Sequence, residues 1–348
     1  MKLKNILTTL FIILLALILK PINAQEKQYK VGCIGFYNLE NLYDTIHQEG
    51  ISDEEFTPDG KSHWTSERYN IKIKHLSEVI AQIGDELVKG GPILMGFAEV
   101  ENRSVVQSLI DAPALKPSNY GIVHYDSPDK RGVDVALIYQ KDHFKVINSY
   151  PVPLNIPDME EFKTRDQLVV KGLFDGEPLN IIVNHWPSRS RGQSVSEPLR
   201  IAAAKLCRSI ADSMMRADQN AKVIIMGDLN DDPIDESLTK AFGANKSIED
   251  TKPGNFYNPM YKLFKDGIGS LAYRDEWNLF DQIIVSYPLL GNDKSKYKFF
   301  KAKVCNKSFL ATKEGAFKGY PFRTYVGTTW QGGYSDHFPV YIFLVKEK

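Results

Sequence analysis

The stretch that decides the fold is residues 223–233, Val-Ile-Ile-Met-Gly-Asp-Leu-Asn-Asp-Asp-Pro. Four successive apolar residues predict a strand that is covered on both faces. The run stops at Gly227, and a carboxylate and an amide, Asp228 and Asn230, follow at once. In an extended backbone these two side chains point to the same side and offer an acceptor and a donor to one small ligand. A turn in which they only satisfy backbone groups is the alternative.

Outward from this stretch, further apolar runs predict an extensive sheet. The predicted strands are residues 31–36, 93–97, 133–139, 168–174, 179–183, 222–226, 282–286 and 339–345. Residues 73–87 and 198–215 have the apolar spacing of amphipathic helices. Together these elements predict an α/β or α+β fold.

The N-terminal residues predict a secretory signal peptide that spans residues 1–24. Lys2 and Lys4 precede an apolar run from Ile6 to Leu19, and cleavage is expected after Ala24. Residues 25–348 then form a single domain. An uncleaved anchor is the alternative, but the run is shorter than the roughly 20 residues that a spanning helix needs. We therefore expect an exported protein without a membrane span, in the periplasm, on the outer surface or secreted, and monomeric without a stable protein partner.

Charge and cysteine content restrict the function only weakly. The chain has 43 Lys and Arg against 43 Asp and Glu, and loss of three lysines with the signal peptide leaves it slightly acidic. A nucleic-acid substrate would therefore have to be held by local basic groups and metal. Cys33, Cys207 and Cys305 permit one disulfide, and three unpaired thiols are the alternative.

Five more of the predicted strands have polar groups at one end. Glu99 follows the run at 93–97 and is a hard oxygen ligand suited to Mg²⁺, with nearby Glu101 as its competitor. Asp336 and His337 directly precede the last run, and Asp281 precedes the run at 282–286 as a partner for the imidazole. The run at 179–183 leads to His185 and Arg189, and Arg165 precedes the run at 168–174. Arginine suits an anionic substrate, although each of these arginines taken singly is more often a surface residue.

The joint order of these motifs resembles the endonuclease/exonuclease/phosphatase superfamily, in its secreted bacterial-type form. The segment Phe36–Asn41 resembles the family's opening strand, Glu99 its metal glutamate, Gly227–Asn230 its GDxN motif and Ser335–His337 its closing SDH motif. Ala98 stands where many members have Gln. The resemblance implies the DNase I-like fold, a four-layer sandwich of two packed mixed β-sheets flanked by helices.

The resemblance also implies roles for individual residues. Glu99 and Asp336 would bind one or two Mg²⁺ or Mn²⁺ ions, with Ca²⁺ possible, and Asn38 would lie close to metal and substrate. Asp228 would orient or deprotonate the attacking water, and His337 would act together with Asp281. The remaining implied phosphate and substrate contacts are Asn230, His185, Arg165, Tyr125 and Arg131. Arg189 is a further candidate because it lies in the Arg-rich loop after His185.

These features predict an exported, divalent-metal-dependent phosphoesterase, with a nucleic-acid endonuclease or phosphodiesterase as the first hypothesis. A set of basic residues after His185 supports it if they face a nucleic-acid backbone: Arg189, Arg191, Arg200, Lys205 and Arg208. The alternative is that these basic residues only form the solvent-exposed face of a helix. Aromatic residues would stack bases, rim a lipid surface or pack internally: Trp186, Tyr273, Trp277, Tyr320 and Trp330. The alternatives in function are a phosphomonoesterase or lipid-headgroup phosphodiesterase of the same fold, and a binding module without catalysis.

Overall fold

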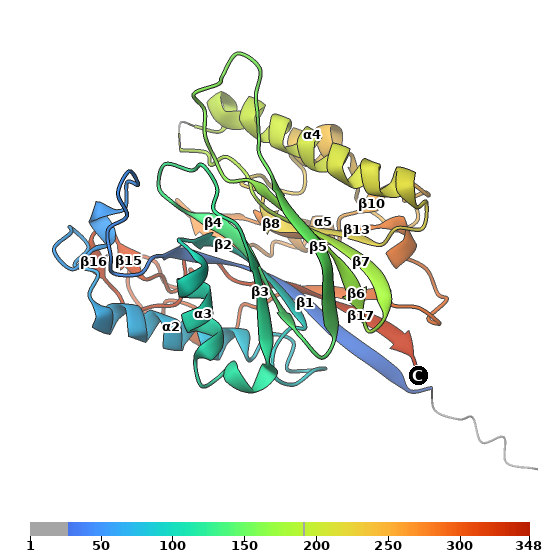
Figure 1. Ribbon diagram of the computed structural model, residues 1–348, viewed down its shortest axis with the longest axis horizontal. Helices are drawn as coiled ribbons and strands as arrows, with labels where there is room; N and C mark the ends of the chain where they lie inside the picture. Colours follow the sequence, from blue (N-terminus) through green and yellow to red (C-terminus); the bar gives the residue numbers. More distant parts are fainter. Residues whose placement is uncertain (1–26, 191) are drawn as a thin grey trace, which may run out of the picture.

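The structure is a computed structural model that describes residues 27–190 and 192–348. Two mixed β-sheets pack face to face, and helices cover their outer faces (Figure 1). The expected four-layer sandwich is therefore confirmed. The predicted signal peptide and Arg191 lie outside the described residues.

The first sheet has six strands and the second has seven. In spatial order the first sheet contains β14 (Lys298–Val304), β17 (Val340–Glu347), β1 (Tyr29–Leu42), β2 (Leu94–Val100), β4 (Asp134–Gln140) and β3 (Tyr120–His124). The second contains β5 (Phe144–Val152), β6 (Gln167–Phe174), β7 (Glu177–His185), β8 (Val223–Asp228), β13 (Asp281–Ser286), β10 (Phe256–Tyr257) and β9 (Ala244–Asn245). Two small hairpins lie outside the sheets: β11 (Leu271–Tyr273) with β12 (Glu276–Asn278), and β15 (Tyr325–Val326) with β16 (Thr329–Trp330).

Successive side chains of β8 point alternately into the two apolar layers that the second sheet separates. Ile224 and Met226 belong to the core between the sheets, whereas Val223 and Ile225 pack in the apolar cluster beneath α4 (Gln193–Ala217). A strand covered on both faces has to be apolar throughout, which is why its sequence is a continuous apolar run. The first sheet is covered on its outer face by α2 (Ser66–Ile80) and α3 (Arg103–Asp111), and the short helix α5 (Met260–Lys265) precedes the first hairpin.

All eight predicted strands and both predicted helices are present, with shifted ends. The first helix ends at Ile80, earlier than expected, and α4 begins at Gln193. Sequence reasoning missed the helix α3 and three strands, β3, β5 and β14. These strands lie at the edges of their sheets and are partly exposed or short. All three cysteines are buried and unpaired, so the alternative with one disulfide is wrong. Within the described residues, no helix is long and apolar enough to cross a membrane.

Strand direction brings the predicted site residues to one edge of the sandwich. The parallel pairs β1 with β2 and β7 with β8 end at this edge, so Asn38, Glu99, His185 and Asp228 gather there. Strand β13 begins at the same edge with Asp281, which pairs with Asp228 in antiparallel register. Both sheets therefore contribute to one site.

Candidate active site

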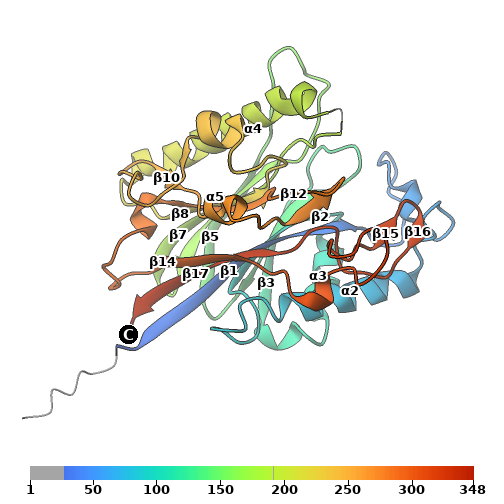
Figure 2. The same cartoon turned by 180° about the vertical axis from the view of Figure 1, so that it is seen from behind.

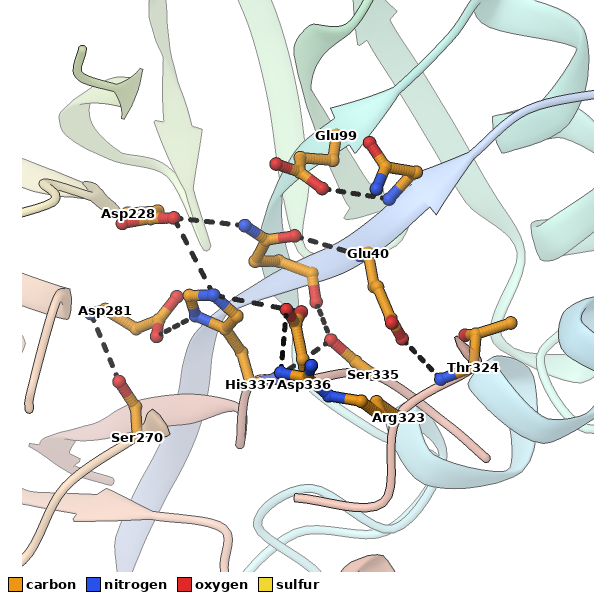
Figure 3. A network of polar contacts seen from close by, with 12 residues as sticks. Glu40, Glu99, Asp228, Ser270, Asp281, Arg323, Thr324, Ser335, Asp336 and His337 are labelled. Atoms are coloured by element: carbon orange, nitrogen blue, oxygen red, sulfur yellow. Dashed lines mark hydrogen bonds and ion pairs between the residues drawn. The ribbon is translucent and has the colours of Figure 1, made fainter. Parts of the chain in front are cut away.

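Five side chains form a continuous series at this edge, which we call the polar arc: Glu99, His185, Asp228, His337 and Asp336. Figure 3 shows Glu99, Asp228, His337 and Asp336. His185 Nε2 lies 3.9 Å from Glu99 Oε1 and 3.7 Å from Asp228 Oδ2. His337 Nε2 lies 4.0 Å from Asp228 Oδ2 and 3.9 Å from Asp336 Oδ1. These separations exceed hydrogen-bond length, so the groups face a shared space without closing it.

Asp228 lies at the centre of the arc, and its orientation is fixed from two sides. Asn38 Nδ2 donates to Oδ2 at 3.0 Å, and the backbone N–H of Asn230 donates to Oδ1 at 3.0 Å. Burial raises the pKa of Asp228 to about 6, an effect that His337 opposes and Asp281 reinforces. The group is therefore a carboxylate at neutral pH with a stronger affinity for a proton than an exposed aspartate.

His337 forms a buried pair with Asp281. Its Nδ1 lies 2.6 Å from Asp281 Oδ2. Burial lowers the pKa of His337, but the carboxylate of Asp281 outweighs this effect and the pKa is well above the usual value. Because Nδ1 is bound to Asp281, the Nε2–H of the imidazolium points toward Asp228 and Asp336 as a donor (Figure 3).

His185 has the opposite protonation. Burial, together with the nearby positive charges of Arg165 and Arg131, holds its pKa well below the usual range. Its Nδ1 is buried and has no hydrogen-bond partner within the described residues. A neutral imidazole donates at one nitrogen only, so His185 is suited to a single hydrogen bond to a phosphate oxygen.

The serine of the SDH motif connects the last strand to the first. Ser335 Oγ donates to the carbonyl oxygen of Asn38 at 2.7 Å and accepts a hydrogen bond from the backbone N–H of His337 at 3.1 Å. The motif thus fixes His337 relative to Asn38, the residue that orients Asp228.

The two glutamates that compete for the metal role lie in different surroundings. Glu99 has a left-handed backbone, φ 60°, which places its carboxylate at the arc, with Oε2 accepting from Asn41 N at 2.9 Å. Glu101 instead accepts a hydrogen bond from Asp44 N at 2.6 Å, and burial raises its pKa to about 7. The arrangement favours Glu99 as the ligand.

Hard oxygen donors are available for a divalent cation. Glu99, Asp336 and Asp228 supply carboxylates around the arc and Asn38 supplies an amide oxygen, the donor types that Mg²⁺ and Mn²⁺ prefer. Asp228, Asp281 and His337 are also close enough to share an ion, although the latter two already bond each other. A second such group, His124, Asp126 and Asp134, lies where β3 ends and β4 begins, with Asp126 exposed. The residues at the arc therefore fit a hard metal ion.

Sequence reasoning missed Glu40 and Arg323. The carboxylate of Glu40 is largely buried beside Asp336 and accepts from Thr324 N at 2.6 Å (Figure 3). Burial and Asp336 raise the pKa of Glu40 to about 7. Arg323 approaches Asp336 from outside at 3.5 Å. Glu40 lies two residues after Asn38 in a segment already singled out, and this spacing was the available signal; no local pattern marks Arg323.

Two arginines predicted to contact phosphate are committed to internal contacts. Arg165 is buried, and its guanidinium donates to Asp129 Oδ2 at 3.0 Å and to the carbonyl oxygen of Trp186 at 2.6 Å. Arg189 donates to the carbonyl oxygen of Asn230 at 2.9 Å and also binds Asp231 and Asp235. Both arginines brace the loops that bear His185 and Asn230, so the geometry does not support an exposed phosphate clamp at either.

Two of the basic residues predicted to hold a nucleic-acid backbone, Arg200 and Arg208, make internal contacts, whereas Lys205 is exposed. Arg200 is fully buried in an ion pair with Asp231, 2.6 Å from Nε to Oδ1. Arg208 bonds Asp212 and the carbonyl oxygen of Phe242. The helical spacing placed these residues on the side of α4 that meets the protein, which corrects the expectation that they hold a nucleic-acid backbone.

The other predicted substrate contacts also differ in their placement. Arg131 lies beside the arc, 3.7 Å from Glu99, with 44% of its side chain exposed. Tyr125 directs its hydroxyl to Ser149 of β5, and within the described residues no contact links it to the arc. Asn230 is next to Asp228, but its amide donates to the carbonyl oxygen of Trp186 at 3.0 Å. Trp186 is buried, so it packs inside the protein and is not available to stack on a base.

Comparison with known families agrees with this geometry. The model of the Endonuclease/Exonuclease/phosphatase family matches residues 33–346. The chain belongs to this family. It is accordingly a metal-dependent hydrolase of phosphate esters, which favours catalysis over a binding module. No curated protein matches the chain.

Several solved structures share the fold. The human Nocturnin catalytic domain with bound sulfate is 17% identical, with a TM-score of 0.54 over 93% of this chain and 98% of that one. A mannosyl-6-phosphatase from Bacteroides thetaiotaomicron is 15% identical, with a TM-score of 0.54 over 90% and 99%. D. rerio TDP2 in complex with a single-strand DNA product gives the same TM-score, 0.54, at 15% identity over 90% and 99%. At such identities the likeness concerns the fold alone, and the substrates of these proteins differ.

Proposed function

We propose that this protein is an exported phosphodiesterase that cleaves nucleic-acid backbones by attack of water on phosphorus. The observation that carries the proposal is a pair of pockets that adjoin the polar arc. One, of about 390 Å³, contains Glu40, Arg131 and Arg323, and we call it the Glu40 pocket. The other, of about 630 Å³, contains Arg323 and Asp336 and lies against the β11–β12 hairpin, so we call it the hairpin pocket.

A diester needs room for a group on each side of its phosphate, whereas a monoester needs room on one side. Arg323 lines both pockets, and Arg131 extends the first toward Glu99. A phosphate at the arc would therefore have one substituent directed into each pocket. Arg131 and Arg323 are 44% and 37% exposed, so they are available to neighbouring phosphates.

The side chains of the arc supply the chemistry of hydrolysis. A divalent cation bound by Glu99 and Asp336 would neutralise charge on the phosphate oxygens. Asp228, fixed by Asn38 and Asn230, orients a water molecule for in-line attack and accepts its proton. The oxygen–phosphorus bond forms as the bond to the leaving oxygen breaks. His337 and His185 donate hydrogen bonds to the phosphate oxygens, where charge accumulates in the transition state.

Hydrolysis assays with the purified protein test the substrate class. Plasmid DNA, RNA, bis-p-nitrophenyl phosphate, p-nitrophenyl phosphate, mannose 6-phosphate and sphingomyelin are compared in Mg²⁺, Mn²⁺ or EDTA. The expected result is EDTA-sensitive cleavage of nucleic acid and of the diester, lost in a variant with both Asp228→Ala and His337→Ala. Activity confined to monoesters or to sphingomyelin would reject the nucleic-acid substrate.

Export is part of the proposal and rests on the sequence pattern of residues 1–24. Expression of the full chain with a C-terminal tag, followed by cell fractionation and N-terminal sequencing, tests it. A protein that begins at Gln25 outside the cytoplasm is expected. An uncleaved chain in the cytoplasm would contradict it.

A further inference from the structure

The β11–β12 hairpin, whose strand β12 is labelled in Figure 2, bears an exposed aromatic residue, Tyr273, which lines the hairpin pocket together with Asp336 of the polar arc. Tyr273 is 63% exposed, and the guanidinium of Arg274 lies 5.1 Å from its ring centroid. Arg274 and Asp275 form the turn with left-handed backbones, φ 51° and 65°. A large exposed ring next to a cation is a surface on which another planar group can stack.

The hairpin is fixed to the segment that bears His337 and leads into β17. The ring of Trp277 stacks on Phe338 with centroids 6.1 Å apart, and the backbone N–H of Phe338 donates to Ser270 O at 2.6 Å. At the turn, Tyr320 donates its hydroxyl hydrogen to Asp275 Oδ1 at 2.6 Å. The position of Tyr273 relative to the arc is therefore set by direct contacts.

Two further residues of the hairpin pocket, Arg189 and Phe280, contact each other. Arg189 lies over the ring of Phe280, 4.4 Å from its centroid, and both residues line the pocket. Asp336 lines the same pocket, so the space is continuous with the arc. A group bound there would lie directly beside the scissile phosphate.

The polarity of the lining indicates the kind of group that fits. Arg274, Glu276 and Asn278 add donors and acceptors close to the exposed ring. A nucleobase has a flat face that stacks and an edge that both donates and accepts hydrogen bonds. An acyl chain would require a continuous apolar wall, which the charged lining does not provide.

We propose that the hairpin pocket binds the nucleoside adjoining the scissile phosphate, with its base stacked on the Tyr273–Arg274 pair. This inference rests on the proposed phosphodiesterase function and deepens it. Tyr273 thereby becomes a specificity residue that distinguishes a nucleotide from other phosphate esters. It makes no contact with the polar arc and takes no part in the chemical step.

Two substrates that share one leaving group test the inference. Thymidine 5′-(p-nitrophenyl phosphate) and methyl p-nitrophenyl phosphate differ only in the second ester group. Tyr273→Ala is compared with Tyr273→Phe, which keeps the ring, and with Tyr287→Ala, which removes another exposed tyrosine at the opposite end of β13 from Asp281. We expect Tyr273→Ala to raise KM for the thymidine ester about tenfold, the size of one lost stacking contact. Its kinetics on the methyl ester should match wild type, as should both control variants on both esters.

An equal loss on both esters, or no loss on either, would overturn the inference. A binding measurement separates its failure from failure of the proposed function. If wild type hydrolyses neither ester, calorimetric titration with thymidine 5′-monophosphate still tests the pocket, and Tyr273→Ala should weaken Kd by about tenfold. Absence of binding to wild type, or equal Kd values for the two proteins, would reject the nucleoside pocket.

Discussion

His337 Nδ1 and Asp281 Oδ2 lie 2.6 Å apart, although the two residues are separated by 56 positions in the sequence. Asp281 begins β13 in the second sheet, and His337 precedes β17 in the first. The hydrogen bond therefore joins the two sheets at the active site. It also holds the proton on the imidazole, which leaves Nε2–H free to donate to a phosphate.

Replacement of Asp281 by asparagine keeps the shape of the side chain but removes its charge. We expect kcat for bis-p-nitrophenyl phosphate to fall about 100-fold, because His337 loses the group that fixes its orientation and its proton. KM and the near-ultraviolet circular dichroism spectrum should stay close to those of wild type. Activity within about twofold of wild type would show that the pair is only structural.

Glu99 and Glu101 form a matched pair for testing the metal site. Glu99→Gln should raise the Mg²⁺ concentration for half-maximal activity at least about tenfold, since a carboxylate ligand is lost. Glu101→Gln retains an oxygen that accepts from Asp44 N, so its Mg²⁺ dependence should be unchanged. A higher Mg²⁺ requirement in Glu101→Gln, with no change in Glu99→Gln, would make Glu101 the metal ligand instead of Glu99.

Arg200 tests whether the basic residues of α4 support the fold or bind substrate. Arg200→Ala leaves Asp231 without this buried partner and should lower the free energy of unfolding by about 3 kcal/mol in urea titrations. The exposed Lys205→Ala on the same helix should change it little. At a temperature where both variants are folded, KM for DNA should be unaltered; a rise in KM with unchanged stability would restore the nucleic-acid role.

Glu177 gives a pH dependence that is remote from the active site. Burial raises its pKa, but ion pairs with Lys222 at 2.5 Å and Lys346 at 2.8 Å outweigh this effect, and the pKa is lowered. Because its pKa is lower in the folded state, the ionised carboxylate stabilises the fold at pH values above about 4.3, the pKa of an unfolded-state glutamate. This stabilisation is lost as the pH falls through the folded-state pKa. Glu177→Gln should therefore cost about 2 kcal/mol at pH 7.

The same linkage predicts how the difference in free energy of unfolding between wild type and Glu177→Gln varies with pH. It should stay constant from pH 7 to about 5 and shrink toward zero at lower pH, as the wild-type carboxylate is protonated. Urea titrations across this range measure it. A difference independent of pH would mean that the side chain contributes only by packing.

Much of the fold was predictable because its central strands are buried on both faces, and β8 is the clearest case. The site was predictable for a related reason, since Asp228 and His337 of the polar arc, and Asp281 beside it, adjoin such runs. Edge strands such as β5 lack this signal, because partial exposure allows polar residues along them.

The role of the arginines was not predictable from local sequence. Arg165 and Arg200 resemble exposed cations in the sequence, but Asp129 and Asp231, distant in the chain, neutralise them within the fold. The approach of Glu40 to Asp336 depends on a left-handed backbone at Glu40, φ 50°, and on Thr324, far along the chain. Such tertiary contacts override what the composition of a segment indicates.

The pairing of β1 with β17 has a consequence for when the enzyme becomes active. Asn38 lies in the C-terminal half of β1, and Ser335, which precedes β17, donates to its carbonyl oxygen. A ribosome must therefore complete β17 before the hydrolytic centre can assemble, and any intermediate that lacks this closing strand has no catalytic power. An enzyme that attacks phosphate esters is in this way harmless to the cell that makes it for as long as its chain is unfinished or held unfolded.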